Sequence, residues 1–193
     1  DDRERWNRKY QQARAGAGEP SAALVELSRW LPGRGRVLDV AGGAGANAVW
    51  LARRGLEVTI VDVSEVGLAL ARTHAQREGV ALATVRADLE VEPLPAGPWA
   101  LVVCCCYLQR DLIPRIVEAL EPGGRLLWIH PTVKNLERHA SPGARFLLQP
   151  GEATALVEAA GRVRVCWAEE AWVGPGDAAR WLARVVAERE PAG

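Results

Sequence analysis

Short apolar runs alternate with amphipathic stretches along most of the chain. Six runs have the length and the apolar or β-branched content of strands: residues 36–40, 57–61, 82–86, 99–105, 125–130 and 162–172. Four stretches between them have the length and residue pattern of helices: residues 46–54, 64–78, 112–120 and 150–161. Strands and helices that alternate in this way predict an α/β fold with a doubly wound, mainly parallel sheet.

Local signals mark the ends of the predicted helices. Ser64 is a suitable N-cap, because its hydroxyl can accept a hydrogen bond from a free amide of the first turn. Gly55 and Gly79 follow two of the helices, at the position where a residue of positive φ is favoured. Five apolar residues within 112–120 form a single stripe, which indicates a helix that packs on the sheet.

The end of the chain is ambiguous. Residues 162–172 alternate apolar and polar side chains around Val163, Val165 and Trp167, which favours a strand. Residues 178–190 are rich in Ala, Leu, Arg and Glu, which favour a helix by propensity. From these residues alone the last element can be a helix or a strand.

Composition and charge indicate one ordinary globular domain. The 193 residues are 49% hydrophobic and 25% charged. No apolar run reaches the ~20 residues that cross a bilayer, and the first residues, DDRER, are too charged for a secretory signal. The 24 basic residues are balanced by 24 acidic ones, whereas nucleic-acid binders usually carry a basic excess. We therefore expect a single domain, residues 1–193, in the cytoplasm, with no membrane or nucleic-acid partner.

Three of the four cysteines are adjacent, at Cys104, Cys105 and Cys106. Their spacing matches neither a disulfide framework nor a CxxC metal motif. In a strand only Cys104 and Cys106 share a face, and buried free cysteines commonly pack as small hydrophobes. We expect packing beside the site, not a metal site.

The strongest functional signal is the sequence VLDVAGGAG at residues 37–45. A strand that contains an acid, Asp39, runs into a glycine-rich turn and then a helix, which brings backbone amides close to a ligand. Two further acids, Asp62 and Asp88, follow the next two strands. Because the carboxyl ends of parallel strands share one edge, the three carboxylates should converge on one crevice. The position of Asp62 suits an acceptor for both hydroxyls of a ribose.

These motifs resemble those of class I (Rossmann-like) S-adenosylmethionine-dependent methyltransferases, whose first motif usually reads VLDxGxGxG. The likeness covers nearly the whole chain and is greatest to small bacterial tellurite-resistance-like methyltransferases. The segments that carry it are residues 6–10, 45–52, 107–110, 120–124 and 146–152. In that group the last element is a strand beside the fifth. The resemblance therefore implies that residues 180–187 form an antiparallel last strand in a seven-stranded sheet with helices on both faces.

The resemblance also implies a site for S-adenosylmethionine. Asp39 would orient the methionyl amino group, Asp62 would bind the ribose, and Asp88 with Leu89 would bind the adenine. Further cofactor-binding residues that it implies are Trp6, Tyr10, Ala41, Gly43, Gly45, Asn47, Val63, Cys104, Cys105 and Arg110.

One departure from the family pattern falls in the first motif. Gly43 and Gly45 are present and would leave room for the cofactor, whereas Ala41 stands where the first glycine is usual. Alanine adds a single methyl group, so we expect a slightly altered turn and weaker cofactor affinity, not lost binding.

Two segments outside the strand–helix repeat are candidates for the acceptor site. Residues 1–30 would form a helical lid, with Trp6 and Tyr10 on one face over the cofactor, and the alternative is ordinary packing of a terminal helix. Residues 131–149 would form a substrate loop, because loops held by a rigid sheet often carry specificity. The positive side chains of this loop and its His139 favour an anionic or metal-like acceptor.

Methyl transfer from a sulfonium needs little from the protein beyond alignment, which can lower the barrier by ~7–11 kcal/mol. A base helps only where the nucleophile starts protonated. His130, at the end of the fifth strand, and Tyr107, after the fourth, are the candidate catalytic residues. The acceptor is expected to be a small molecule, and the chain a monomer or homodimer.

Two other functions fit part of the sequence. Residues 43–48 satisfy the GxGxxA pattern of NAD(P)-dependent oxidoreductases. However, the acid ahead of Gly43, the acid Asp88 and the short chain oppose that function. A non-catalytic protein that binds S-adenosylmethionine or S-adenosylhomocysteine would have the same cofactor motifs, and only turnover of an acceptor separates it from an enzyme.

Overall fold

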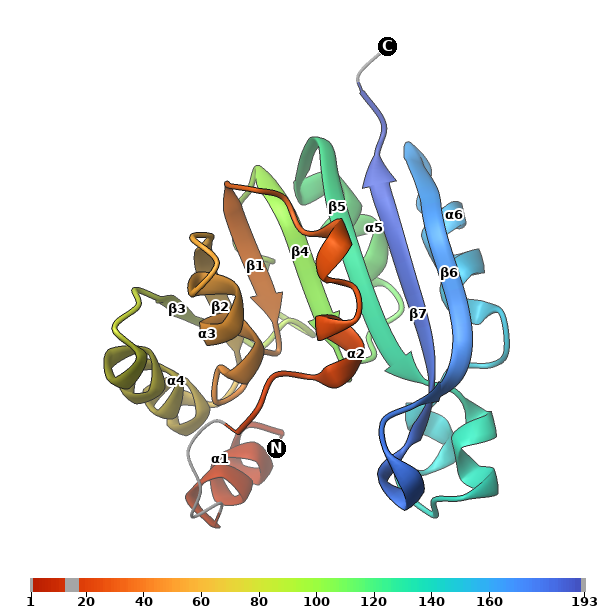
Figure 1. The fold of residues 1–193 in the computed structure, drawn as a ribbon, viewed down its shortest axis with the longest axis horizontal. Coiled ribbons are helices and arrows are strands. Elements are labelled where there is room, and N and C mark those ends of the chain that lie inside the picture. The colour runs from red at the N-terminus through yellow and green to blue at the C-terminus, as the bar shows by residue number, and fades with distance from the viewer. Residues whose placement is uncertain (1, 13–17, 192–193) are drawn as a thin grey trace.

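The computed structural model of the chain describes residues 2–12 and 18–191 and centres on one seven-stranded sheet (Figure 1). The strands lie in the order β3-β2-β1-β4-β5-β7-β6. Their bounds are β1 Arg36–Val40, β2 Glu57–Asp62, β3 Ala83–Arg86, β4 Trp99–Cys105, β5 Leu120–Pro131, β6 Val163–Val173 and β7 Arg180–Arg189. The predicted seven-stranded, doubly wound α/β fold is confirmed.

Six of the seven described strands point in the same direction, and β7 runs against them. Neighbouring strands pair in parallel from β3 to β5, whereas β7 is antiparallel to both β5 and β6. The antiparallel last strand implied by the resemblance is thus present, against the helix propensity of its residues. Residues 182–187 are all buried and hydrogen-bonded to a strand on each side. Burial and pairing outweigh a propensity that amounts to less than ~1 kcal/mol per residue.

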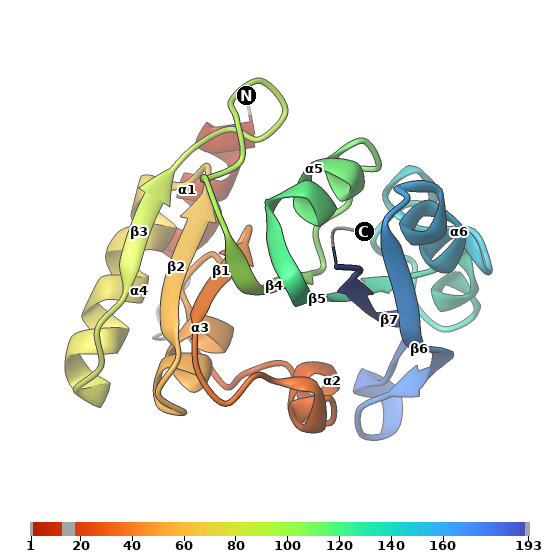
Figure 2. The same cartoon turned by 90° about the horizontal axis from the view of Figure 1, so that it is seen from above.

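Helices cover both faces of the sheet (Figure 2). One apolar core joins the sheet to α5 and α6, and the other joins it to α2, α3 and α4. The α-helices are α1 Asp2–Gln12, α2 Ala22–Val25, α3 Ala46–Ala52, α4 Glu65–Glu78, α5 Leu112–Ala119 and α6 Glu152–Ala159. Single 3-10 turns are η1 Ser28–Trp30, η2 Val133–Glu137, η3 Ala144–Phe146 and η4 Gly176–Ala178.

Most of the predicted helix ends agree with the structure, and those that differ have local causes. Ser64 caps α4 by accepting a hydrogen bond from the Gly67 amide, and Gly55 and Gly79 have positive φ as predicted. The helix predicted from Pro150 instead begins at Glu152, because Gly151 before it adopts a left-handed conformation. The predicted loop at residues 131–149 contains η2 and η3.

Three segments lie at the carboxyl end of the parallel strands, which is the lower end in Figure 1. They are α1, the 131–149 segment and the turn between β6 and β7. This edge is where open α/β sheets bind ligands. Within residues 2–12 and 18–191, no helix is long and apolar enough to span a membrane.

Candidate active site

The turn after β1 is built from residues in left-handed conformations. Ala41 has φ 52°, Gly43 φ 55° and Gly45 φ 82°. For alanine this conformation costs about 1–2 kcal/mol. Ala41 therefore adopts a conformation that glycine takes more readily, and it carries local strain at the edge of the site, whereas the weaker cofactor affinity expected from this alanine stays a prediction.

Gly45 and Asn47, at the start of α3, both contact other parts of the protein. A Cβ added at Gly45 would lie 2.7 Å from the Ala71 Cβ, so this glycine lets α3 approach α4. The side-chain oxygen of Asn47 accepts a hydrogen bond of 2.8 Å from the Ser21 amide and fixes the segment before α2. The structure thus gives both residues contacts with the protein, and their proposed contact with the cofactor stays a prediction.

Asp62 joins the glycine turn to the start of α4. Its two carboxylate oxygens accept hydrogen bonds from the amides of Gly43, at 2.9 Å, and Ser64, at 2.8 Å. Burial raises the pKa of Asp62, and the hydrogen bonds from neighbouring amides oppose that rise. The carboxylate is 7% exposed and still lines the cavity described below. It can therefore hold the turn and accept further hydrogen bonds from a ligand.

Asp39 lies deeper, and its Oδ2 is buried with no hydrogen-bond partner among the described residues. Burial and the nearby charge of Asp62 raise the pKa of Asp39 to about 7. A buried carboxylate without a partner is costly, and a cationic donor would remove that cost. The site therefore suits a positively charged group at this point.

A cavity of about 220 Å³ lies over the carboxyl ends of β1, β2 and β4. Eight residues of the predicted cofactor set line it: Trp6, Tyr10, Ala41, Asp62, Val63, Asp88, Leu89 and Cys105. The candidate catalytic residue Tyr107 lines it as well. Sequence reasoning missed Asp2, Val61, Ala87, Glu90 and Cys106. A signal for Cys106 was available, because the residue that follows a parallel strand lies at its carboxyl end.

Six residues of the predicted cofactor set do not line this cavity: Asp39, Gly43, Gly45 and Asn47, whose places are described above, and Cys104 and Arg110. Cys104 is buried in the core, where its thiol contacts the carbonyl oxygen of Tyr107 at 3.6 Å. Arg110 pairs with Glu152 through Nε and Oε1 at 2.5 Å, which joins the start of α5 to α6. The alternation of side chains along β4 puts Cys105, not Cys104, on the cavity side.

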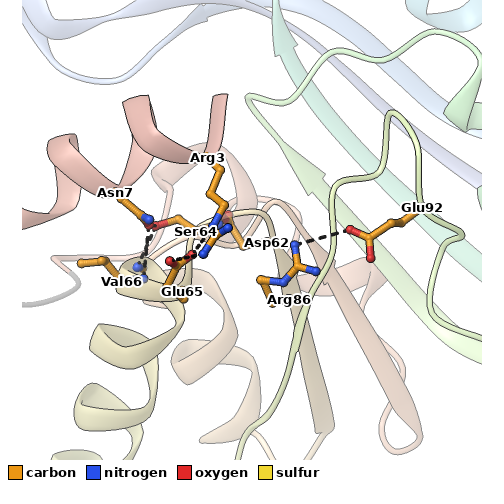
Figure 3. A network of polar contacts seen from close by, with 9 residues as sticks. Arg3, Asn7, Asp62, Ser64, Glu65, Val66, Arg86 and Glu92 are labelled. Carbon is orange, nitrogen blue, oxygen red and sulfur yellow. Dashed lines mark hydrogen bonds and ion pairs between the residues drawn. The ribbon is translucent and has the colours of Figure 1, made fainter. Parts of the chain in front are cut away.

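The helix α1 is held over the cavity by polar contacts (Figure 3). Arg3 forms a two-pronged ion pair with Glu65, at 2.7 and 2.9 Å, and this contact lowers the pKa of Glu65 to about 2. The Asn7 side-chain oxygen accepts hydrogen bonds from the Ser64 hydroxyl, at 2.6 Å, and the Val66 amide, at 3.4 Å. None of the described side chains of α1 is fully buried.

Tyr10 brings α1 into contact with the glycine turn. Its ring stacks on Trp6 at 5.9 Å between centroids, and both side chains line the cavity. Its hydroxyl lies against Gly43, so closely that a Cβ there would overlap it. Burial, together with the charges of Asp62 and Asp39, raises the pKa of Tyr10, so the hydroxyl stays protonated. Tyr10 therefore covers the turn as a neutral hydrogen-bond donor.

The two candidate catalytic residues have different surroundings. The Tyr107 hydroxyl donates to Gln109 at 2.8 Å, and burial raises its pKa. His130 does not line the cavity: its Nε2 lies 2.9 Å from the Phe146 carbonyl oxygen, so Nε2 must carry the proton. Burial lowers the pKa of His130 and keeps the ring neutral. His130 fixes the 131–149 segment, and a direct role in the chemistry stays a prediction.

Together, the strand order, the glycine turn and the acids at the ends of β1, β2 and β3 agree with the class I methyltransferase fold that the resemblance implies. This strand order also differs from the 3-2-1-4-5-6 order of dinucleotide-binding folds, because β7 is inserted antiparallel beside β5. The oxidoreductase alternative therefore loses support.

Comparison with known proteins gives the same class. Residues 37–124 match the family model of a methyltransferase domain. A ribosomal protein L11 methyltransferase from Thermus thermophilus is 37% identical over 129 residues, which are 64% of this chain and 50% of the relative. A ubiquinone biosynthesis O-methyltransferase from Acinetobacter baumannii is 37% identical over 101 residues, 48% of this chain and 42% of the relative. The chain spans about half the length of these curated relatives.

Solved structures share the fold. An S-adenosylmethionine-dependent methyltransferase from Mesorhizobium loti has a TM-score of 0.71 and 20% identity, over 88% of this chain and 98% of its own. TehB from Haemophilus influenzae has a TM-score of 0.70 and 16% identity, over 99% of this chain and 68% of its own. At such identities the likeness concerns the fold alone. Residues 37–124 therefore match a methyltransferase domain, and the fold of the chain is that of S-adenosylmethionine-dependent methyltransferases.

Proposed function

We propose that the chain transfers a methyl group from S-adenosylmethionine to a small-molecule acceptor. The observation that carries this proposal is the cavity at the carboxyl ends of β1, β2 and β4, with acids in its wall and α1 across it. Such a covered cavity favours a small acceptor over a folded protein. Four unpaired cysteines are compatible with a reducing, cytoplasmic setting.

The acids in and beside the cavity fit the proposed cofactor. The unpartnered Oδ2 of Asp39 suits the cationic amino group of its methionyl part. Asp62 lies in the cavity wall and can accept from ribose hydroxyls. Asp88 and Leu89 line the same cavity after β3, where a carboxylate and a backbone amide can bind the edge of an adenine.

The cofactor supplies a methyl group already activated on a sulfonium, so the chain's own task is alignment. Trp6 and Tyr10 cover the cavity and would exclude water from the reacting atoms. Tyr107 keeps its proton, which it donates to Gln109, so it is a poor base. We infer that the acceptor enters between α1 and the 131–149 segment and arrives with its nucleophile largely deprotonated.

Deleting residues 1–12 is expected to lower the rate of methyl transfer at least tenfold while the melting temperature falls by only a few degrees. The physical reason is that α1 supplies part of the cavity wall yet adds no fully buried side chain to the core. Product formation from radiolabelled S-adenosylmethionine and a thermal melt of the same samples measure the two effects.

A paired set of point variants separates the cavity face of α1 from its outer face. Trp6→Ala with Tyr10→Ala should reproduce most of the lost rate. The control, Arg8→Ala with Gln12→Ala, changes two exposed residues of the same helix and should be neutral. Wild-type rate and affinity in the truncated chain would show that α1 is only packing.

A further inference from the structure

Basic and aromatic side chains gather where the 131–149 segment meets the turn between β6 and β7. The rings of Trp172 and Trp181 meet edge to face at 5.5 Å. The Lys134 Nζ lies 4.0 Å from the Trp181 ring centroid, and the Arg138 Cζ lies 4.0 Å from that of Trp172. These contacts fix two positive charges on a rigid platform of indoles.

A third positive charge, Arg180, is oriented by its neighbours. The His139 Nε2 lies 2.6 Å from the Ala179 carbonyl oxygen, which can only accept, so the proton is on Nε2. The His139 Nδ1 is then free to accept from the Arg180 Nη1, at 3.0 Å. All the contacts of the guanidinium with described residues are made by Nη1.

The other edge of this guanidinium is therefore available. Its Nε and Nη2 have no hydrogen-bond partner among residues 2–12 and 18–191, and Arg180 is exposed. These two N–H groups form the planar fork that binds a carboxylate through two parallel hydrogen bonds. Because Arg180 is held through Nη1 while Nε and Nη2 are free of hydrogen bonds to described residues, its guanidinium is already oriented to bind an oxyanion.

Within the described part of the chain, no carboxylate forms an ion pair with this cluster, although Glu137 and Asp177 lie on the same two segments. Arg110, Arg125, Arg164 and Arg184 pair with glutamates in the same half of the sheet. Lys134, Arg138, Arg145 and Arg180, in contrast, form no ion pair with a described residue. An anion that binds there meets positive charges that no ion pair with a described residue occupies.

The strand register puts Arg180 beside the mouth of the cavity. The Cys106 amide donates to the Ile129 carbonyl oxygen, so Cys106 is level with the end of β5. β7 begins at Arg180 and pairs with the same end of β5, where Pro131 faces Leu182. Only β5, about 5 Å wide, thus separates the strand that bears Arg180 from the strand that leads to Cys106. Burial raises the pKa of the Cys106 thiol and the Arg180 charge opposes that rise, which agrees with this proximity.

We propose that the open fork of Arg180 binds a carboxylate of the acceptor, with Lys134 and Arg138 adding to the positive field. The acceptor would then be a small carboxylate-bearing molecule whose nucleophile reaches into the cavity past Cys106. This inference rests on the proposed methyl transfer for its biological meaning, whereas the anion site itself can be tested without turnover.

The test uses the full chain with and without S-adenosylhomocysteine, titrated with benzoate or with its neutral isostere benzamide. Nitrogen-15 NMR follows the indole N–H signals of Trp172 and Trp181. Benzoate is expected to give saturable shifts of these signals and benzamide none. Arg180→Gln should weaken benzoate binding at least about tenfold. The matched control is Arg164→Gln, an exposed arginine on the same hairpin that is paired with Glu188.

The outcomes separate the inference from the proposed function. Equal shifts with both compounds, no shift with either, or full benzoate binding by Arg180→Gln would overturn the carboxylate site. Inorganic phosphate that shifts the signals more strongly than benzoate would overturn the choice of a carboxylate. Failure of S-adenosylhomocysteine to bind would remove the proposed function instead, and the titrations of the unliganded chain would still be readable.

Discussion

Replacing Asp62 with alanine is expected to weaken the binding of S-adenosylhomocysteine at least about tenfold. A carboxylate that accepts hydrogen bonds from two hydroxyls contributes ~1.5–3 kcal/mol for each bond, and tenfold is 1.4 kcal/mol. The structure adds a second cause, because Asp62 also accepts the amide hydrogen bonds of Gly43 and Ser64. Isothermal titration calorimetry measures the loss, and a thermal melt shows that the variant is folded.

The exposed acid Asp177, in the turn between β6 and β7, provides the control. Asp177→Ala removes the same chemical group outside the cavity and should leave the affinity unchanged. Asp62→Asn should fall between the wild type and Asp62→Ala, since its one carbonyl oxygen can still accept a single amide. Unchanged affinity in a folded Asp62→Ala protein would mean that the ribose binds elsewhere.

The affinity for S-adenosylhomocysteine is expected to rise with pH and to level off above the pKa of Asp39, about 7. Below that value Asp39 is mostly protonated in the unliganded protein, and binding a cationic amino group must release the proton. One released proton gives a slope of up to about tenfold per pH unit. Calorimetry between about pH 5.5 and 8, in two buffers of different ionisation enthalpy, measures the affinity and the proton released.

The raised pKa of Asp39 also affects the stability of the unliganded chain, which should fall as pH rises, whereas the ligand affinity should increase. The pKa of Asp39 is raised from its ordinary 3.8, so the protonated form favours folding. That contribution is complete below about pH 4 and is lost as pH rises through about 7. The unliganded chain should lose stability over this range, and the ligand should restore it.

Asp39→Asn provides the control for both effects. Asparagine has the same shape but no titration, so binding should become weaker and independent of pH in this range. A wild-type affinity that stays flat from pH 5.5 to 8 would contradict the ionisation of Asp39 on binding.

Local sequence patterns located the strands and the glycine turn well, because each depends on neighbours in the chain. Periodicity predicted β1 and β4 to the residue, and the side chain of Ser64 marked the start of α4. The last strand was different. Its residues favour a helix, and only the family resemblance indicated the strand, since its stability comes from pairing with β5 and β6.

Contacts between distant residues could not be predicted from the sequence. Arg110 was placed at the cofactor, yet it pairs with Glu152, 42 residues away. His130 was placed in the pocket by its position at the end of a strand, yet its ring points to the Phe146 carbonyl oxygen. In both cases the direction of the side chain was decided by a partner from a distant part of the chain, the 131–149 segment for His130 and α6 for Arg110.

The most direct test of the central claim is a calorimetric titration of the full chain with S-adenosylmethionine, S-adenosylhomocysteine and NADH. The cavity has Asp62 and Asp88 in its wall, and the buried Asp39 lies on the adjacent strand, which predicts micromolar binding of the first two ligands. It predicts no measurable binding of NADH. Tight binding of NADH with no response to the other two would contradict the account.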